Sequence, residues 1–443
     1  MAVATAQRYA GTGAGTAPPE RAPGGRMESP HRLWIMLLAA VIAVLLAGCV
    51  AATGLSGRQS TAEHTAQATE ALYSEVQDLS YNLADANATA ATALLIGPVT
   101  PKPFTDRFGS DITQVEDLLS AASQRVTGDA TASHELRLLA EQVPEYSQWV
   151  GEALANNRFG YPVAGAYLRQ ASAMLTGSMV PEVDTVITEE QNATENGISS
   201  ASGTDWLTVG VCVLALVVLV LVGSVLARST KRRMNLGVVA AKLAVLVLLG
   251  WTFTAAVGSS GAASTARGDF DLIVQTQVGA SQLATSEAYI ALQQIDRGEN
   301  GTGDQQQATA ALTALGPLTY PEFQAATGAS KTSKATATAI KAMVTCGEGA
   351  INQAAAGNYA QAIITTVGTG SDVGQGGCEP AAQQVRDDLS ALTKQSQGHY
   401  DTDMASVSSA YAGGGALVLP LALGLLGAVA AAWGINRRLA EYR

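Results

Sequence analysis

Two apolar stretches joined by a short basic segment decide the fold of this chain. The first, residues 206–227, reads WLTVGVCVLALVVLVLVGSVLA, and the second, residues 237–257, reads GVVAAKLAVLVLLGWTFTAAV. The segment between them, 228–236, reads RSTKRRMNL. Each stretch is long enough to cross a hydrocarbon core about 30 Å thick as an α-helix. We therefore predict two transmembrane helices joined by a basic turn.

Two further apolar stretches, 33–55 and 412–435, complete a set of four predicted spans. Because the cytoplasmic segments of membrane proteins are enriched in Lys and Arg, the positions of these residues predict the orientation. Both termini and the loop 228–236 are predicted to be cytoplasmic, in a multi-pass protein of the plasma membrane. The basic residues are Arg8, Arg21, Arg26 and Arg32 in the first tail, Arg228, Lys231, Arg232 and Arg233 in the loop, and Arg437, Arg438 and Arg443 at the end.

The two long segments between the spans, 56–205 and 258–411, are predicted to be exterior domains of ordinary size. Both are acidic, and the formal net charge of the chain is −11. Residues 1–32 and 436–443 remain as cytoplasmic tails, and the composition of the first predicts disorder. Nucleic-acid binding is disfavoured, because the basic clusters lie beside predicted spans, where membrane lipid is their expected partner.

Both exterior segments have helical periodicity and no alternating strand pattern. In the first, an apolar seam from Leu72 to Ala93 extends the first span outward until Gly97-Pro98 stops it. Tyr146, Trp149 and Val150 are expected in the core. The predicted fold class is an all-α membrane protein with four transmembrane helices and two exterior antiparallel helical bundles. The other expected helices are 104–127, 131–157 and 164–204 in the first domain, the last leading into the second span, and 258–297, 304–328, 331–356, 358–367 and 379–411 in the second.

The two halves of the chain resemble each other. Residues 83–91 read LADANATAA and align with residues 283–291, which read LATSEAYIA. Each half contains a span, an exterior domain and a second span, so we predict a tandem duplication. The repeat is parallel, whereas inverted repeats are common in secondary transporters.

The cysteines have different expected roles. Cys346 and Cys378 both lie in the second exterior segment, and an even pair in an oxidising compartment predicts a disulfide, with two free thiols as the alternative. Cys212 lies inside the second span and is expected to pack as a small apolar residue. Cys49 ends the sequence Leu46-Ala47-Gly48-Cys49, which resembles a bacterial lipobox. We favour an uncleaved span there and keep a lipidated Cys49 as the alternative.

Residues with the spacing of catalytic or metal-binding motifs are not found in this sequence. No histidine has a second His or a Cys at ligand spacing, so we predict no enzymatic activity, no metal site and no cofactor. The acid pairs Glu189-Glu190 and Asp387-Asp388 are expected on exposed helix faces. Phe159 and Tyr161 occupy a predicted turn and are candidate contacts for a partner, with core packing as the alternative.

The predicted layout is similar to that of known sensors. A span, an exterior four-helix bundle and a second span resemble the sensory half of bacterial chemoreceptors, without their cytoplasmic half. The duplicated form, from about 33 to 435 and including the Leu83–Gly97 helix, resembles the GlnX-type membrane proteins of actinobacteria. The resemblance implies an adaptor between an exterior amino-acid-binding lipoprotein, GlnH, and a cytoplasmic serine/threonine kinase, PknG. It implies no particular binding residues.

Three functions therefore remain open. We favour a non-enzymatic transmembrane adaptor that passes exterior nutrient sensing to a cytoplasmic kinase, with the loop 228–236 as the exit for the signal. Alternatively, the loop only sets the orientation of the protein in the membrane and contacts lipid. A direct small-ligand sensor would need a polar pocket inside a bundle, whereas the predicted cores are mainly Ala and Leu. An envelope scaffold or transporter accessory protein is the third class, and a homo-oligomer is compatible with each.

Overall fold

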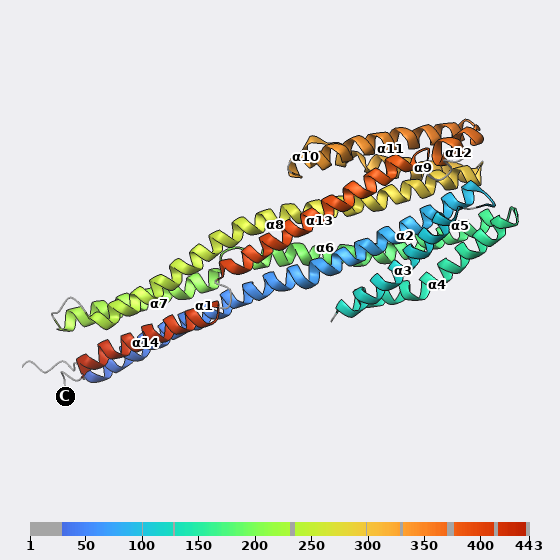
Figure 1. Cartoon of the computed structure of the whole chain (residues 1–443). Coiled ribbons are helices and arrows are strands. Elements are labelled where there is room, and N and C mark those ends of the chain that lie inside the picture. Colours follow the sequence, from blue (N-terminus) through green and yellow to red (C-terminus); the bar gives the residue numbers. More distant parts are fainter. Residues whose placement is uncertain are drawn as a thin grey trace, which may run out of the picture.

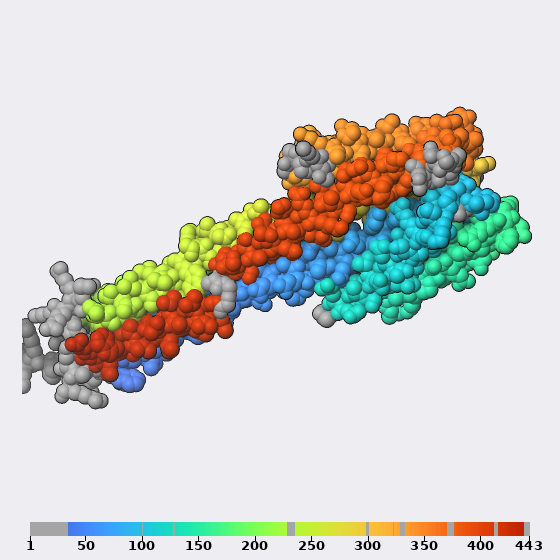
Figure 2. All heavy atoms as spheres, viewed as in Figure 1, coloured from blue at the N-terminus to red at the C-terminus, as the bar shows by residue number. Residues whose placement is uncertain are grey.

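The protein is a long helical rod. The computed structural model describes residues 29–99, 101–126, 129–230, 235–297, 299–327, 331–369, 376–411 and 415–439, and none of these residues forms a β-strand. Figure 1 shows α7, α14 and parts of α1 and α8 at one end, helical lobes at the other end and a stalk between them. In Figure 2 the two lobes lie side by side at the far end of the rod.

Among the described residues, four helices are long and apolar enough to cross a membrane. They are α1 (Ser29–His64), α7 (Trp206–Thr230), the first part of α8 (Leu236–Asp296) and α14 (Val418–Leu439). Their facing sides bury apolar residues against one another, and their outer sides expose large ones such as Leu214, Leu246 and Leu426. A helix bundle with an apolar outer surface suits lipid, so the arrangement is consistent with a multi-pass membrane protein.

Glycines bring α14 close to two neighbouring helices. A Cβ added to Gly424 would lie 2.9 Å from the Cα of Gly48 on α1, and one added to Gly434 would lie 2.8 Å from the Cα of Gly237 on α8. Asn235 Nδ2 also donates a hydrogen bond to the Gly434 carbonyl at 2.9 Å. Small residues that let helix backbones approach are typical of helix pairs in membranes.

The fourth apolar helix begins later than predicted. It starts at Val418 instead of at 412, and residues 412–414 lie outside the described residues. Pro420 explains the start, because proline is tolerated in the first turn of a helix but disrupts its interior.

Two helices run without interruption from the apolar bundle into the lobes. α1 continues through a π-helical turn, η1 (Thr65–Thr69), into α2 (Glu70–Ile96). α8 is a single helix of 61 residues. These two continuous rods lie side by side for much of their length (Figure 1).

The predicted continuity between the helix 164–204 and the second span is wrong. That segment forms α5 (Ala164–Met174), the π-helical turn η2 (Leu175–Met179) and α6 (Val180–Ala201), and the helix stops before α7. Gly203 has a φ of +96°, which favours glycine and ends the helix. Arg58 donates to the carbonyls of Ser202 and Gly203 at 2.9 and 3.0 Å, and Asp205 accepts from the backbone of Leu207 at 3.2 Å to start α7.

The first lobe, lobe 1, is built from α2, α3 (Lys102–Arg125), α4 (Ala130–Arg158), α5 and α6. Asp129 caps α4 by accepting hydrogen bonds from the backbone of Thr131 and Ala132. Tyr146 and Val150 are buried in the core, as expected. Trp149 is only partly buried at the edge of that core, where its ring stacks on Tyr167 with centroids 5.8 Å apart.

The second lobe, lobe 2, is built from the end of α8, α9 (Glu299–Ala314), η3 (Gly316–Thr319), α10 (Pro321–Ala326), α11 (Lys331–Ala355), α12 (Tyr359–Val367) and the start of α13 (Glu379–Ala410). The single helix expected at 304–328 is therefore three short elements. Pro317 and Pro321 account for the breaks, because each stands in the first turn of a new element. A separate apolar core fills this lobe.

The stalk joins both halves of the chain. In its core Phe270 of α8 packs edge-to-face against Tyr73 of α2 and at a tilt against Tyr400 of α13, with ring centroids 5.1 and 6.0 Å apart. Tyr411 donates to Ser259 Oγ at 2.9 Å and contacts the Ala201 carbonyl. The apolar bundle and the lobes are thus connected by a packed core shared between the halves.

Candidate functional site

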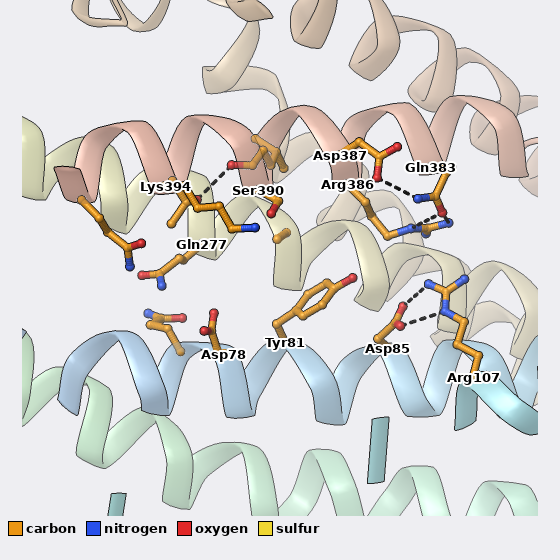
Figure 3. A pocket seen from close by; sticks show the side chains of 15 residues that line it. Asp78, Tyr81, Asp85, Arg107, Gln277, Gln383, Arg386, Asp387, Ser390 and Lys394 are labelled. Atoms are coloured by element: carbon orange, nitrogen blue, oxygen red, sulfur yellow. Dashed lines mark hydrogen bonds and ion pairs between the residues drawn. The ribbon is translucent and has the colours of Figure 1, made fainter. Parts of the chain in front are cut away.

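A polar pocket lies where the two lobes meet (Figure 3). Its volume is about 470 Å³, within the range of small-molecule sites. Its walls come from α2 and α3 of lobe 1 and from α8 and α13 of lobe 2. A ligand pocket was expected only inside a bundle, whereas this one lies between the bundles, where the polar faces of their helices meet. We call it the inter-lobe pocket.

Two arginines close one end of the inter-lobe pocket. Arg107 of α3 donates to the two carboxylate oxygens of Asp85 on α2 at 2.9 and 2.5 Å, and its guanidinium lies 3.5 Å from Glu379 on α13. Arg386 of α13 donates to the two oxygens of Glu287 on α8 at 3.0 and 2.7 Å, and also pairs with Glu379. Glu379 therefore contacts both arginines and ties lobe 1 to lobe 2. We call these five residues the inter-lobe charge cluster.

A buried acid lies next to this cluster. Asp111 of α3 is 5 % exposed. Burial raises the pKa of Asp111 to about 7, the negative charge of Asp85 adds to the rise, and Arg107 opposes it. Asp111 therefore changes its charge near neutral pH, and the net charge between the lobes depends on pH.

The other end of the pocket holds polar side chains from three helices. Figure 3 shows Asp78 of α2, Gln277 of α8 and Lys394 of α13 pointing into the same region. Asp78 is exposed to the pocket, yet the surrounding lobes partly bury it and raise its pKa to about 6, against the opposing effect of Gln277. Gln277 is only 6 % exposed and lies close enough to Asp78 to lower the pKa of that carboxyl, yet neither of its side-chain polar atoms meets hydrogen-bond geometry with a partner among the described residues.

A disulfide holds the start of α13, the helix that carries Glu379 and Arg386 of the inter-lobe charge cluster. Cys346 and Cys378, the pair expected from the sequence, are joined with an S–S distance of 2.03 Å. Cys378 is the residue directly before α13, and its backbone nitrogen donates to the Thr366 carbonyl on α12 at 3.2 Å. The start of α13, and with it Glu379, is thereby attached to α11 and α12.

The other candidate residues lie away from the pocket. Phe159 and Tyr161 are 74 % and 56 % exposed at the turn between α4 and α5, at the end of the rod opposite the spans, and their rings stack 5.8 Å apart. Both are therefore accessible to a partner. Cys49 is exposed in the middle of the continuous α1, and Cys212 is buried in α7.

The basic loop falls largely outside the described residues. This applies to Lys231, Arg232 and Arg233, and only the backbone of Arg228 is described, at the end of α7. Among the residues that the structure describes, no group of three or more His, Cys, Asp or Glu side chains is placed to hold a metal ion.

The acid pairs differ from their expected exposure. Glu190 and Asp388 are buried, with 9 % and 8 % exposure. Adjacent residues on a helix point about 100° apart, so one member of a pair turns inward when the other faces solvent. Burial raises the pKa of Glu190 to about 7, and Asp388 accepts a hydrogen bond from Gln384 at 2.8 Å.

Sequence reasoning identified Asp387 of the pocket lining only as an exposed acid and missed the site that it lines. Arg107, Arg386 and Gln277 carried no recognisable motif. A signal was nevertheless present in the repeated seam, where Asp85 and Glu287 stand among small apolar residues. A buried carboxylate needs a partner, so each of these acids indicated a cation elsewhere in the chain.

Residues 61–198 match the family model of an actinobacterial sensor domain. These residues form lobe 1 and the adjoining part of the stalk. The matched residues begin near the end of α1 and stop near the end of α6, so they include the α2 and α3 walls of the pocket, while α8 and α13 lie outside the match. No curated protein and no solved structure matches the chain. The match supports a protein of actinobacterial sensor type and indicates a sensing or signalling role.

Proposed function

We propose that this protein is a non-enzymatic transmembrane sensor that passes an exterior signal to a separate cytoplasmic protein. The observation that carries the proposal is the pair of continuous rods, α1–η1–α2 and α8, which reach from the apolar bundle to the inter-lobe pocket. A relative shift of the lobes would move both rods, and small helix shifts are an established form of switching.

The match of lobe 1 to a sensor-domain model supports signal transfer from the lobes toward the opposite end of the apolar bundle. In the proposed topology both lobes are exterior bundles, because their segments are acidic and the flanking loop and tails are basic. The order of elements also supports a tandem duplication, since a long rod, a lobe and a second apolar helix occur twice.

The proposed partners follow from the GlnX-type resemblance. An exterior solute-binding lipoprotein would dock on the lobes, where Phe159 and Tyr161 are accessible, and a serine/threonine kinase would receive the signal at the loop 228–236. Direct ligand sensing is the second candidate function, and the inter-lobe pocket favours it.

Orientation is tested by cysteine labelling in intact cells, in a variant whose Cys49 is replaced by serine. Ser200 and Ser260 are exposed on the lobe side of the apolar bundle, and Ser229 belongs to the opposite side. A membrane-impermeant maleimide should label cysteines at 200 and 260 but not at 229. Labelling at 229 in unpermeabilised cells would overturn the topology.

Transmission is tested at Gly261, which lies on α8 just beyond the predicted span and has nothing within 4 Å of its Cβ position. Gly261→Pro should interrupt the rod, because proline removes a helix hydrogen bond and costs about 3 kcal/mol. Gly261→Ala is the matched control, since it keeps the helix. We expect kinase-dependent phosphorylation to follow added amino acids in wild-type and Gly261→Ala cells, but not in Gly261→Pro cells. An unchanged response in Gly261→Pro, with normal membrane insertion, would contradict transmission through α8.

A further inference from the structure

The inter-lobe pocket contains an unsatisfied buried amide. Gln277 points into it from α8, and neither polar atom of its side chain meets hydrogen-bond geometry with another described residue, although Gln277 is more than nine-tenths buried. A buried polar group without a partner costs about 1–3 kcal/mol. Such a group is retained at little cost when a ligand supplies the missing donor and acceptor.

The charges of the pocket fall into two groups. At one end, Arg107 and Arg386 are already neutralised by carboxylates of the inter-lobe charge cluster. At the other end, Lys394 and Asp78 take part in none of the ion pairs among the described residues. At the arginine end Asp387 of α13 also lines the pocket; it accepts a hydrogen bond from Gln383 at 2.9 Å and takes part in none of these ion pairs. The end opposite the arginines therefore offers one ammonium, from α13, and one carboxylate, from α2, outside the ion pairs of the described residues.

These groups define the chemistry of an occupant. An anionic group of a ligand would pair with Lys394, a cationic group would pair with Asp78, and Gln277 can donate to the former or accept from the latter. Hydrogen bonds between ionised groups are about twice as strong as neutral ones. A molecule with a single charge would leave either Lys394 or Asp78 without a ligand partner.

We infer that the inter-lobe pocket binds a small zwitterion, held by Lys394, Asp78 and Gln277. The inference deepens the proposed sensing function, because the contacts come from both lobes. Asp78 belongs to lobe 1, whereas Gln277 and Lys394 belong to helices of lobe 2. An occupant that contacts both lobes stabilises one relative position of the two rods, which is the requirement for a ligand to shift a conformational equilibrium.

Binding is measured on the purified full-length protein in lipid nanodiscs by calorimetry. The probes are taurine, γ-aminobutyrate and each of the twenty L-amino acids, with propionate and propylammonium as singly charged controls. We expect at least one zwitterion to bind and neither control to bind detectably. Lys394→Met and Asp78→Asn should each raise the Kd of that zwitterion at least tenfold, since each removes a charge-assisted contact.

Matched variants separate the pocket from general surface charge. Lys341 on α11 and Asp117 on α3 are exposed and lie outside the pocket lining. Lys341→Met and Asp117→Asn should leave the Kd unchanged. Gln277→Leu should weaken binding and raise the melting temperature of the ligand-free protein, because it removes the unsatisfied amide. That paired effect distinguishes a ligand contact from a structural one.

Three results would overturn the inference: no binding by any zwitterion of the set, equal binding by a singly charged control, or an unchanged Kd in both Lys394→Met and Asp78→Asn. Failure of the sensing function is recognised separately. If a zwitterion binds in the pocket but the phosphorylation response is absent in wild-type cells, the pocket assignment stands and the signalling proposal fails.

Discussion

The ion pair between Arg386 and Glu287, which joins α13 to α8 within lobe 2, offers the sharpest test of the inter-lobe charge cluster. The two side chains are 7 % and 14 % exposed, and their closest N–O distance is 2.7 Å. Arg386→Met removes the cation and leaves Glu287 without its closest partner. The methionine retains much of the buried aliphatic volume, so the change in stability reports the lost charge.

The expected magnitude follows from burial. Breaking one side of a buried ion pair costs about 3–5 kcal/mol. Arg107 also acts on Glu287 and lowers its pKa, so we expect the lower end, about 3 kcal/mol. For domains of this size that corresponds to a fall in melting temperature of roughly 6–12 °C.

The assay is thermal unfolding of the full-length protein in detergent, followed by circular dichroism at 222 nm. The double variant Arg386→Met/Glu287→Leu should recover to within about 1 kcal/mol of wild type, because an apolar pair replaces the buried charges. Arg137→Met is the surface control, since its pairing with Glu141 is exposed on both sides, and it should cost about 0.5 kcal/mol or less. The reasoning is refuted if Arg386→Met is no less stable than Arg137→Met, or if the double variant is no more stable than Arg386→Met.

Three further outcomes are expected. The pKa of Asp111 is raised to about 7 in the folded protein, so its carboxyl contributes a loss of stability that is absent below about pH 4 and reaches its full size as pH rises through 7. Asp111→Asn should remove this contribution, so that in melting curves the variant gains up to about 4 kcal/mol over wild type at pH 7.5 and nothing at pH 4; an equal difference at both pH values would contradict it. Replacing Cys346 and Cys378 by serine removes a disulfide between residues 32 apart and should lower the free energy of unfolding in denaturant by about 3 kcal/mol. Equal unfolding midpoints of the wild-type protein with and without reductant would contradict this stabilisation. Gly424→Val should lower the yield of folded protein in size-exclusion chromatography, because the Cβ of the valine would meet the α1 backbone. Gly250→Val is the control and should not lower the yield, since that position is surrounded by open space. Similar yields of the two variants would mean that the close helix contact is dispensable.

The sequence alone determined the features that depend on local physical chemistry. A run of about twenty mainly apolar residues can be recognised within one segment, without knowing what that segment contacts. The stretches 33–55, 206–227, 237–257 and 412–435 therefore identified the four described helices that can cross a membrane. Helical periodicity and helix-stopping residues such as Pro98 similarly predicted most of the helices in both lobes, because a helix is stabilised by contacts within four residues. They did not predict the breaks at Pro317 and Pro321 or the end of α6 before α7.

Tertiary structure alone decided how these helices meet. Arg386 and Glu287 are 99 residues apart, and no periodicity connects them. The break before α7 depends on Arg58, which reaches carbonyls 144 and 145 residues away. The inter-lobe pocket forms only when the polar faces of α2, α3, α8 and α13 are brought together, so its ammonium, carboxylate and amide are separate surface residues in the sequence and become a site only after the two lobes pack.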